Sequence, residues 1–234
     1  LHYYKFKDMA ILANTVYQRV LAIANKEQRG YITPLEFNLL ANQAQLEIFE
    51  NYFIELNQAL TVPGNESEYS DIIKTLNEKI SLFKTRANLT KSGSFFLYPS
   101  DMYKLGTLWS AQAGLLEDGV EVQEINEDEL LDYYKSPLTT PNRSRPLYIR
   151  RTENIRIISS PSITSGVSCS YTKKPAKAEW GYIVVNEQAL YNASASTDFE
   201  LHVSEETNLV MKILGLAGVV IQRQELMALG QQQA

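Results

Sequence analysis

The feature that most constrains this chain is a long helix between residues 33 and 60, which has a clear start and apolar residues on two sides. Thr33, Pro34 and Glu36 predict its first turn: a hydroxyl cap, a proline at the first helical position and a glutamate that closes a capping box. Pro63-Gly64 predicts its end at about Leu60. Its apolar residues form two rows, one with Phe37, Leu40, Ala44 and Ile48, the other with Leu39, Leu46, Phe49, Phe53, Leu56 and Leu60.

A surface helix of a monomer needs only one apolar stripe, so a helix with two must be covered on both sides. One interpretation is a central helix buried inside its own domain. The other is that one row meets the next copy of the same protein in a ring. On the second interpretation, Phe49, Phe53 and Leu56 are candidate subunit-interface residues.

Helices precede and follow a β-rich region. Helical periodicity covers residues 9–28 and, more weakly, 70–84. From Phe95 onward the chain has short β-prone runs separated by turn residues. Strands are expected at residues 103–116, 120–122, 147–151, 154–159, 167–172 and 182–185, with a short helix capped by Asn126 at 127–134. A cap and two acidic residues at 204–206 begin the last helix, and residues 222–234 form a polar tail.

This order predicts an α+β fold: a helical bundle with a β-rich antiparallel insertion. The bundle is expected to combine two long N-terminal helices with a C-terminal helix. The expected parts are residues 1–90, the N-terminal helical part; 91–200, the insertion; and 201–234, the closing helix and tail.

Composition limits what the chain does. With 44% apolar and 21% charged residues, it resembles an ordinary globular protein. The net charge of -5 disfavours non-specific nucleic-acid binding as the main activity. With one cysteine, Cys169, the chain cannot form an intramolecular disulfide or a cysteine zinc cluster, which fits a reducing compartment. The longest apolar run, residues 213–221, is too short to span a membrane, and residues 1–8 lack the core of a signal peptide.

Residues for catalysis are scarce. The chain has two histidines, and His202 at the entry to the last helix is interpreted as a capping or core-edge residue. No phosphate-binding loop, HExxH, GxSxG or calcium-loop spacing occurs in the sequence. We therefore expect no enzyme, no cofactor and no metal site.

A sharp reversal of charge lies in the β-rich region. Eight acidic residues fall between 117 and 132, and nine basic residues between 135 and 177 are interrupted only by Glu153. Three interpretations stay open: phosphate binding, a scattered solvated surface, or the acidic segment of one subunit against the basic segment of the next. The last adds these candidate interface residues: Glu121, Glu124, Asp128, Arg143, Arg145, Arg150 and Arg151.

Several stretches resemble structural proteins of marine tailed phages. They are residues 14–21, 25–38, 42–45, 199–206 and 212–219, while Tyr171–Pro175 and Trp180–Tyr182 resemble adaptor proteins of short-tailed phages. The family resemblance implies a head-to-tail connector, an adaptor that forms a ring of twelve copies. One face would bind the portal protein and the other a tail or nozzle protein, with double-stranded DNA passing through the channel and no membrane involved.

The resemblance thus places the chain in the neck or tail of a virion, made in the bacterial host cytoplasm. A different tail or neck protein of the virion is one alternative. A DNA-binding regulatory protein that uses the basic segment is an alternative from another class.

Overall fold

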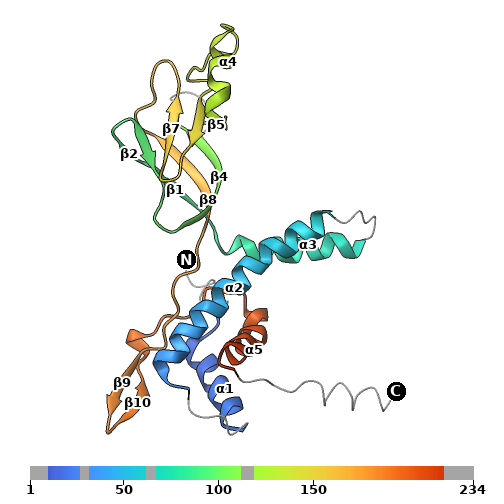
Figure 1. The fold of residues 1–234 in the computed structure, drawn as a ribbon, viewed down its shortest axis with the longest axis vertical. Coiled ribbons are helices and arrows are strands. Elements are labelled where there is room, and N and C mark those ends of the chain that lie inside the picture. The colour runs from blue at the N-terminus through green and yellow to red at the C-terminus, as the bar shows by residue number, and fades with distance from the viewer. Residues whose placement is uncertain (1–9, 27–31, 62–66, 112–118, 219–234) are drawn as a thin grey trace, which may run out of the picture. The chain divides into compact units, whose positions relative to one another are not determined.

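We analysed a computed structural model of the chain, which describes residues 10–26, 32–61, 67–111 and 119–218. They form two compact units. Unit 1 combines residues 1–82 with 175–234, and unit 2 is the intervening segment 83–174. The expected β-rich insertion, residues 91–200, begins and ends further along the chain than unit 2 does. Figure 1 shows the elements of both units.

Unit 1 contains α1 (Ala13–Lys26), α2 (Pro34–Thr61), α3 (Ser67–Ser81) and α5 (Glu206–Leu216). It also holds a small hairpin of β9 (Tyr182–Val185) and β10 (Gln188–Tyr191), and two short 3-10 turns, η3 (Ala193–Ala195) and η4 (Val203–Glu205). The predicted capping box is confirmed. The Thr33 amide donates to the Glu36 carboxylate (3.0 Å), and the Glu36 amide donates to the Thr33 hydroxyl (3.3 Å). The hydrogen bond from the Thr33 backbone lowers the pKa of Glu36.

The core of unit 1 lies where α1, α2 and α5 meet. It contains these fully buried side chains: Val16, Val20, Phe37, Ala44, Ile48, Phe49, Phe199, Leu201, Leu209, Ile213 and Leu214. Asp198 accepts a hydrogen bond from the Ala13 amide (2.9 Å) at the start of α1, and ion pairs join α5 to both other helices. Burying each large side chain contributes roughly 1.5–3 kcal/mol.

Unit 2 is an eight-stranded sheet in the order β1-β8-β4-β5-β6-β7-β3-β2. The strands are β1 (Lys84–Asn88), β2 (Thr90–Ser92), β3 (Phe95–Leu97), β4 (Met102–Ser110), β5 (Val120–Glu124), β6 (Leu147–Arg150), β7 (Asn154–Ile158) and β8 (Val167–Lys173). The two edge strands, β1 and β2, are separated in the chain by Leu89 alone, so the sheet nearly closes on itself. The Leu89 amide donates to the carbonyl of Val167 (2.8 Å) at this corner.

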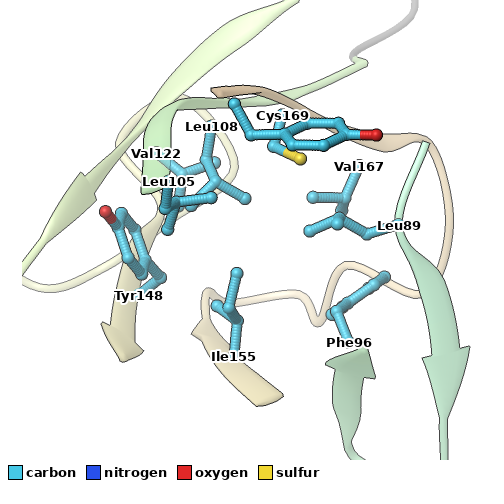
Figure 2. Packing of buried hydrophobic residues seen from close by; sticks show 10 residues of the cluster. Leu89, Phe96, Leu105, Leu108, Val122, Tyr148, Ile155, Val167 and Cys169 are labelled. Carbon is cyan, nitrogen blue, oxygen red and sulfur yellow. The ribbon is translucent and has the colours of Figure 1, made fainter. Parts of the chain in front are cut away.

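Ten buried side chains fill the inside of this sheet (Figure 2): Leu89, Phe96, Leu105, Leu108, Val122, Tyr148, Ile155, Val167, Cys169 and Tyr171. β6 is buried on its other face too, where Leu147 and Ile149 join Ile125 and Ile158. Leu130 of the short helix α4 (Leu130–Tyr134) packs against this second cluster. The sheet therefore has its own core.

The expected fold was wrong in two respects. The β-rich region is a large, nearly closed mixed sheet with its own core, and the chain is not a helical bundle with a small β insertion. The sheet is not purely antiparallel either, because β5 and β6 pair in parallel. Among the strands that the sequence did not predict, β1 and β2 are polar, and their pairing with β8 and β3 nearly closes the sheet.

Several local predictions were confirmed. Asn126 forms a capping box with Glu129 at the 3-10 turn η2 (Glu127–Glu129), which leads into α4. β6 and β7 form a hairpin around Thr152-Glu153, and β9 lies at 182–185 as expected. The expected end of the first strand, residues 112–116, and the tail 222–234 lie outside the described residues.

Candidate assembly surfaces

Side-chain amides on α2 hold an extended segment of the chain, residues 176–180, along the helix. Asn38 donates to the Trp180 carbonyl (3.3 Å) and accepts from its amide (2.8 Å). One turn later, Asn42 donates to the Ala178 carbonyl (2.8 Å) and accepts from its amide (2.9 Å). The helix thus binds alternate residues of the extended segment. This is possible because the length of one helical turn along its axis is close to the length of two residues of extended chain.

Gln45 completes this amide clasp, which we define as Asn38, Asn42 and Gln45. Its side chain donates to the Ala176 carbonyl (2.7 Å) and accepts from the Glu200 amide (3.2 Å). On the other side of the segment, Glu179 and Thr197 exchange two backbone hydrogen bonds (2.9 and 2.8 Å). The segment therefore has partners along both edges and is fixed in position.

Trp180 ends this segment and anchors the hairpin that follows. Its indole nitrogen donates to Asn14 of α1 (3.1 Å), and its ring centroid lies 4.3 Å from that of Tyr17. Tyr182 and Tyr191, the first and last residues of the hairpin, lie with ring centroids 5.8 Å from Trp180. The base of the hairpin is thus held to α1 and α2 through one buried side chain.

The strands of the hairpin are apolar, yet every residue of β9 is exposed. Ile183, Val184 and Val185 are 50, 66 and 44% exposed, and Leu190 of β10 is 47% exposed. Exposed apolar patches of this kind mark interaction sites.

A second exposed apolar surface lies on α2, on the side away from its buried residues. We call it the α2 row: Leu35, Leu39, Leu46 and Leu60, which are 69, 67, 41 and 64% exposed. Leu46 lies seven residues after Leu39 and Leu60 lies fourteen residues after Leu46, while Leu35 lies one turn before Leu39. Residues at such spacing lie along one side of a helix.

The structure divides the residues expected to form an interface on α2. Phe49 is completely buried in the core of unit 1, and its ring meets the ring of Phe53 edge-on at 5.1 Å. Phe53 and Leu56 are half-buried. Of the two expected rows, the first is buried at Phe37, Ala44 and Ile48. The second is buried at Phe49 and exposed at Leu39, Leu46 and Leu60.

The acidic and basic segments of unit 2 meet within the same chain. Arg151 forms an ion pair with Glu127 (3.0 Å), and its guanidinium lies 5.2 Å from the ring centroid of Phe95. Tyr148 donates to Glu124 (2.8 Å), and burial, together with this bond, raises the pKa of Tyr148.

The other expected interface residues of unit 2 are exposed, namely Glu121, Asp128, Arg143, Arg145 and Arg150. Arg143 and Arg145 lie in the turn after Asn142, whose side chain accepts from the amide of Arg145 (2.9 Å). These side chains are exposed, and the acidic and basic residues belong to the same unit.

A nearly buried ion pair joins α3 to the start of α5. Lys79 lies 2.6 Å from Glu205, which also accepts from Asn208 (3.0 Å). Burial opposes ionisation of Glu205, but the hydrogen bonds from Asn208 and Lys79 outweigh it and lower its pKa. Lys79 also lines an open groove of about 650 Å³ between α2 and α3, with Leu76 and Glu55 among its walls.

The remaining candidate groups are structural. His202 caps η4 by accepting from the Ser204 amide (3.3 Å), as the sequence suggested. Cys169 is buried in the sheet, and burial raises the pKa of its thiol. Within the described ranges, no three histidine, cysteine or acidic side chains gather in an arrangement that would hold a metal ion. The helices in those ranges include none long and apolar enough to cross a membrane.

Sequence reasoning missed the amide clasp and the exposed hairpin. The spacing of Asn38, Asn42 and Gln45 places three amides on one side of a largely apolar helix, and this was an available signal. The apolar run Tyr182–Val185 followed by Asn186 was a second one. What the sequence did not show is that the clasp binds the segment leading into the hairpin.

No protein-family model matches the chain, and comparison with curated proteins finds no significant match.

Proposed function

We propose that this chain is a structural protein that acts by associating with copies of itself, and that it serves as a head-to-tail connector in a phage particle. The observation that carries self-association is the concentration of exposed apolar side chains on two separate surfaces of unit 1, the α2 row and the β9–β10 hairpin. A subunit of a closed ring needs two different surfaces, one for each neighbour.

The position in the particle is supported by the sequence resemblance to connector proteins. In that role the ring binds a portal protein on one face and a tail or nozzle protein on the other, and packaged DNA passes through its channel. Two of the resembling stretches are in contact, because the Asn38 side chain of α2 exchanges two hydrogen bonds with the backbone of Trp180. This contact gives these residues a structural reason to occur together.

The test is the assembly state of the purified full-length chain. Light scattering and negative-stain microscopy should give a ring of defined mass, either alone or after addition of the portal protein from the same particle. A chain that stays monomeric at high concentration, with and without portal, would refute the proposal. Crosslinking within virions to a neighbour other than the portal would indicate a different station in the tail or neck.

A DNA-binding regulatory protein is the second candidate, supported by the exposed arginines 143, 145, 150 and 156 of unit 2. The ion pair of Arg151 with Glu127 weighs against it, because nearby acids reduce the positive potential that phosphates require. Binding of duplex DNA that weakens steeply with salt would favour this candidate. Absence of binding at low salt would remove it.

A further inference from the structure

One half of the outer surface of the sheet in unit 2 is polar and positively charged. Strands β1, β8 and β4 are neighbours in the sheet (Figure 1), and their apolar residues point to its inside. Because side chains alternate along a strand, the residues between them point outward. We call these outward residues the β1–β8–β4 face: Lys84, Arg86, Asn88, Ser168, Ser170, Thr172, Lys104, Gly106 and Trp109.

The β1–β8–β4 face carries three exposed cations and no acidic residue. Lys84 and Lys104 both lie opposite Thr172, one on each side of β8, and Arg86 lies two residues after Lys84 on β1. The spacings of a sheet place the three Cα atoms within about 12 Å of one another. This is close to the Debye length of about 8–10 Å, so their potentials add at the surface. A surface that serves solubility alone usually intersperses both signs of charge.

The net charge of the chain is unevenly divided between the two units. Unit 2 has twelve lysines and arginines against ten acidic residues, a net charge of +2, so the acidic excess of the chain lies in unit 1. Within unit 2, Glu121 of β5 lies opposite Trp109 and bounds the face on that side. The net charge of -5 therefore does not describe the surroundings of this face.

Two planar groups lie together on the face. Trp109 and Arg86 lie on opposite sides of β8, and the Arg86 guanidinium is 4.5 Å from the Trp109 ring centroid. Bases of single-stranded nucleic acids stack on aromatic rings and on guanidinium planes, because every base has a π face. The bases of a duplex are already stacked on one another, so a duplex offers only its phosphates to such a surface.

The sheet backbone lies close to the surface between Lys104 and Trp109. The Ser170 hydroxyl accepts from the Thr107 amide (2.9 Å), and a Cβ atom on Gly106 would lie 2.6 Å from that hydroxyl oxygen. Glycine and serine thus leave no large side chain standing between the lysines and the tryptophan. A flexible strand can lie against the sheet there.

We propose that the β1–β8–β4 face binds single-stranded nucleic acid. Lys84 and Lys104 contact phosphates, and a base stacks on the plane formed by Trp109 with Arg86. Cations beside a stacking plane are the combination that binds single strands without preference for sequence. This site is additional to the proposed role in assembly and uses neither Arg143 nor Arg145.

Fluorescence anisotropy of the full-length chain tests the site. The probe is a fluorescein-labelled oligothymidylate of about 12 nucleotides, within the range of single-strand site sizes, with the matching duplex as comparison. The charge variant is Lys84→Ala with Lys104→Ala, and the stacking variant is Trp109→Leu. The matched control, Arg143→Ala with Arg145→Ala, removes two exposed cations of the same unit from outside the face.

The charge and stacking variants should differ in their response to salt. Three phosphate contacts make binding about 20-fold weaker at about 200 mM than at about 50 mM salt, and the charge variant should lose only about threefold. Trp109→Leu should weaken binding about tenfold and leave the salt dependence unchanged, because stacking does not release counterions. Urea unfolding of each variant shows that unit 2 stays folded.

Three results would each overturn the inference: no binding at the lower salt, duplex bound as tightly as the single strand, or a loss in the arginine control as large as in the charge variant. The last result would assign the binding to the arginines of residues 143–145 instead. The proposed assembly is measured separately by light scattering, so it stands or fails independently of these outcomes.

Discussion

Replacing Asn42 by alanine should reveal how much the amide clasp contributes to unit 1. The Asn42 side chain makes three hydrogen bonds: one to the Ala178 carbonyl (2.8 Å), one from the Ala178 amide (2.9 Å) and one to the Asn38 carbonyl (2.7 Å). Ala178 is only 3% exposed, so water has little access to its amide and carbonyl once the side chain is removed.

The magnitude follows from these contacts. Each hydrogen bond contributes about 1 kcal/mol, and a buried group left without a partner costs about 1–3 kcal/mol. Asn42→Ala should therefore lower the free energy of unfolding of unit 1 by about 2–4 kcal/mol. Asn42→Asp should be at least as damaging at neutral pH, because a carboxylate would face the carbonyls of Asn38 and Ala178.

The chain has one tryptophan in each unit, which makes the measurement specific. Trp109 belongs to unit 2 and Trp180 to unit 1, directly beside the clasp. In a Trp109→Phe background, urea unfolding followed by fluorescence reports on unit 1. Gln43→Ala is the control, because the Gln43 side chain is exposed and bonds only to Glu47 among the hydrogen bonds described. We expect Gln43→Ala to lower the free energy of unfolding by less than about 0.5 kcal/mol. If Asn42→Ala lowers it by no more than Gln43→Ala does, this reasoning is refuted.

Four further outcomes are expected. Lys79→Met leaves nearly buried Glu205 without its cation and should cost about 3 kcal/mol in urea unfolding. Because hydrogen bonds lower the pKa of Glu205, its contribution is complete above pH 4.5 and is lost as the pH falls below it, so Glu205→Gln should flatten the acid loss of stability. Gly181→Ala would place a methyl group 2.5 Å from the Ala195 carbonyl and should increase hydrogen exchange throughout the hairpin. The buried, high-pKa thiol of Cys169 should react with a thiol reagent only after denaturant is added, and rapid reaction of the native chain would contradict its placement.

The local elements could be predicted from the sequence. Thr33 with Glu36 and Asn126 with Glu129 form capping boxes in which all partners lie within three residues. Helical period and turn residues also act over short distances, which explains why α1, α2, α5 and the β6–β7 hairpin were found with small errors at their ends.

The sheet could not be predicted in the same way. Residues 84–92 are mostly polar, and only their pairing with β8 on one side and β3 on the other makes them strands. This closure depends on partners up to 88 residues away, as in the pair Lys84 and Thr172. Whether this segment forms strands is decided by the strands available to pair with it and by burial against their side chains. The hydrophobic periodicity of a short segment carries no information about either.

For the assembly surfaces, the sequence by itself determined that α2 has apolar residues on two sides. Only the tertiary structure decided which of them are used. Phe49 lies in the core while Leu39 and Leu46 stay exposed, because α1, α5 and the clasped segment cover other sides of the helix. Burial depends on what packs against a side chain, and on α2 that includes residues 176–180, more than 130 positions further along the chain.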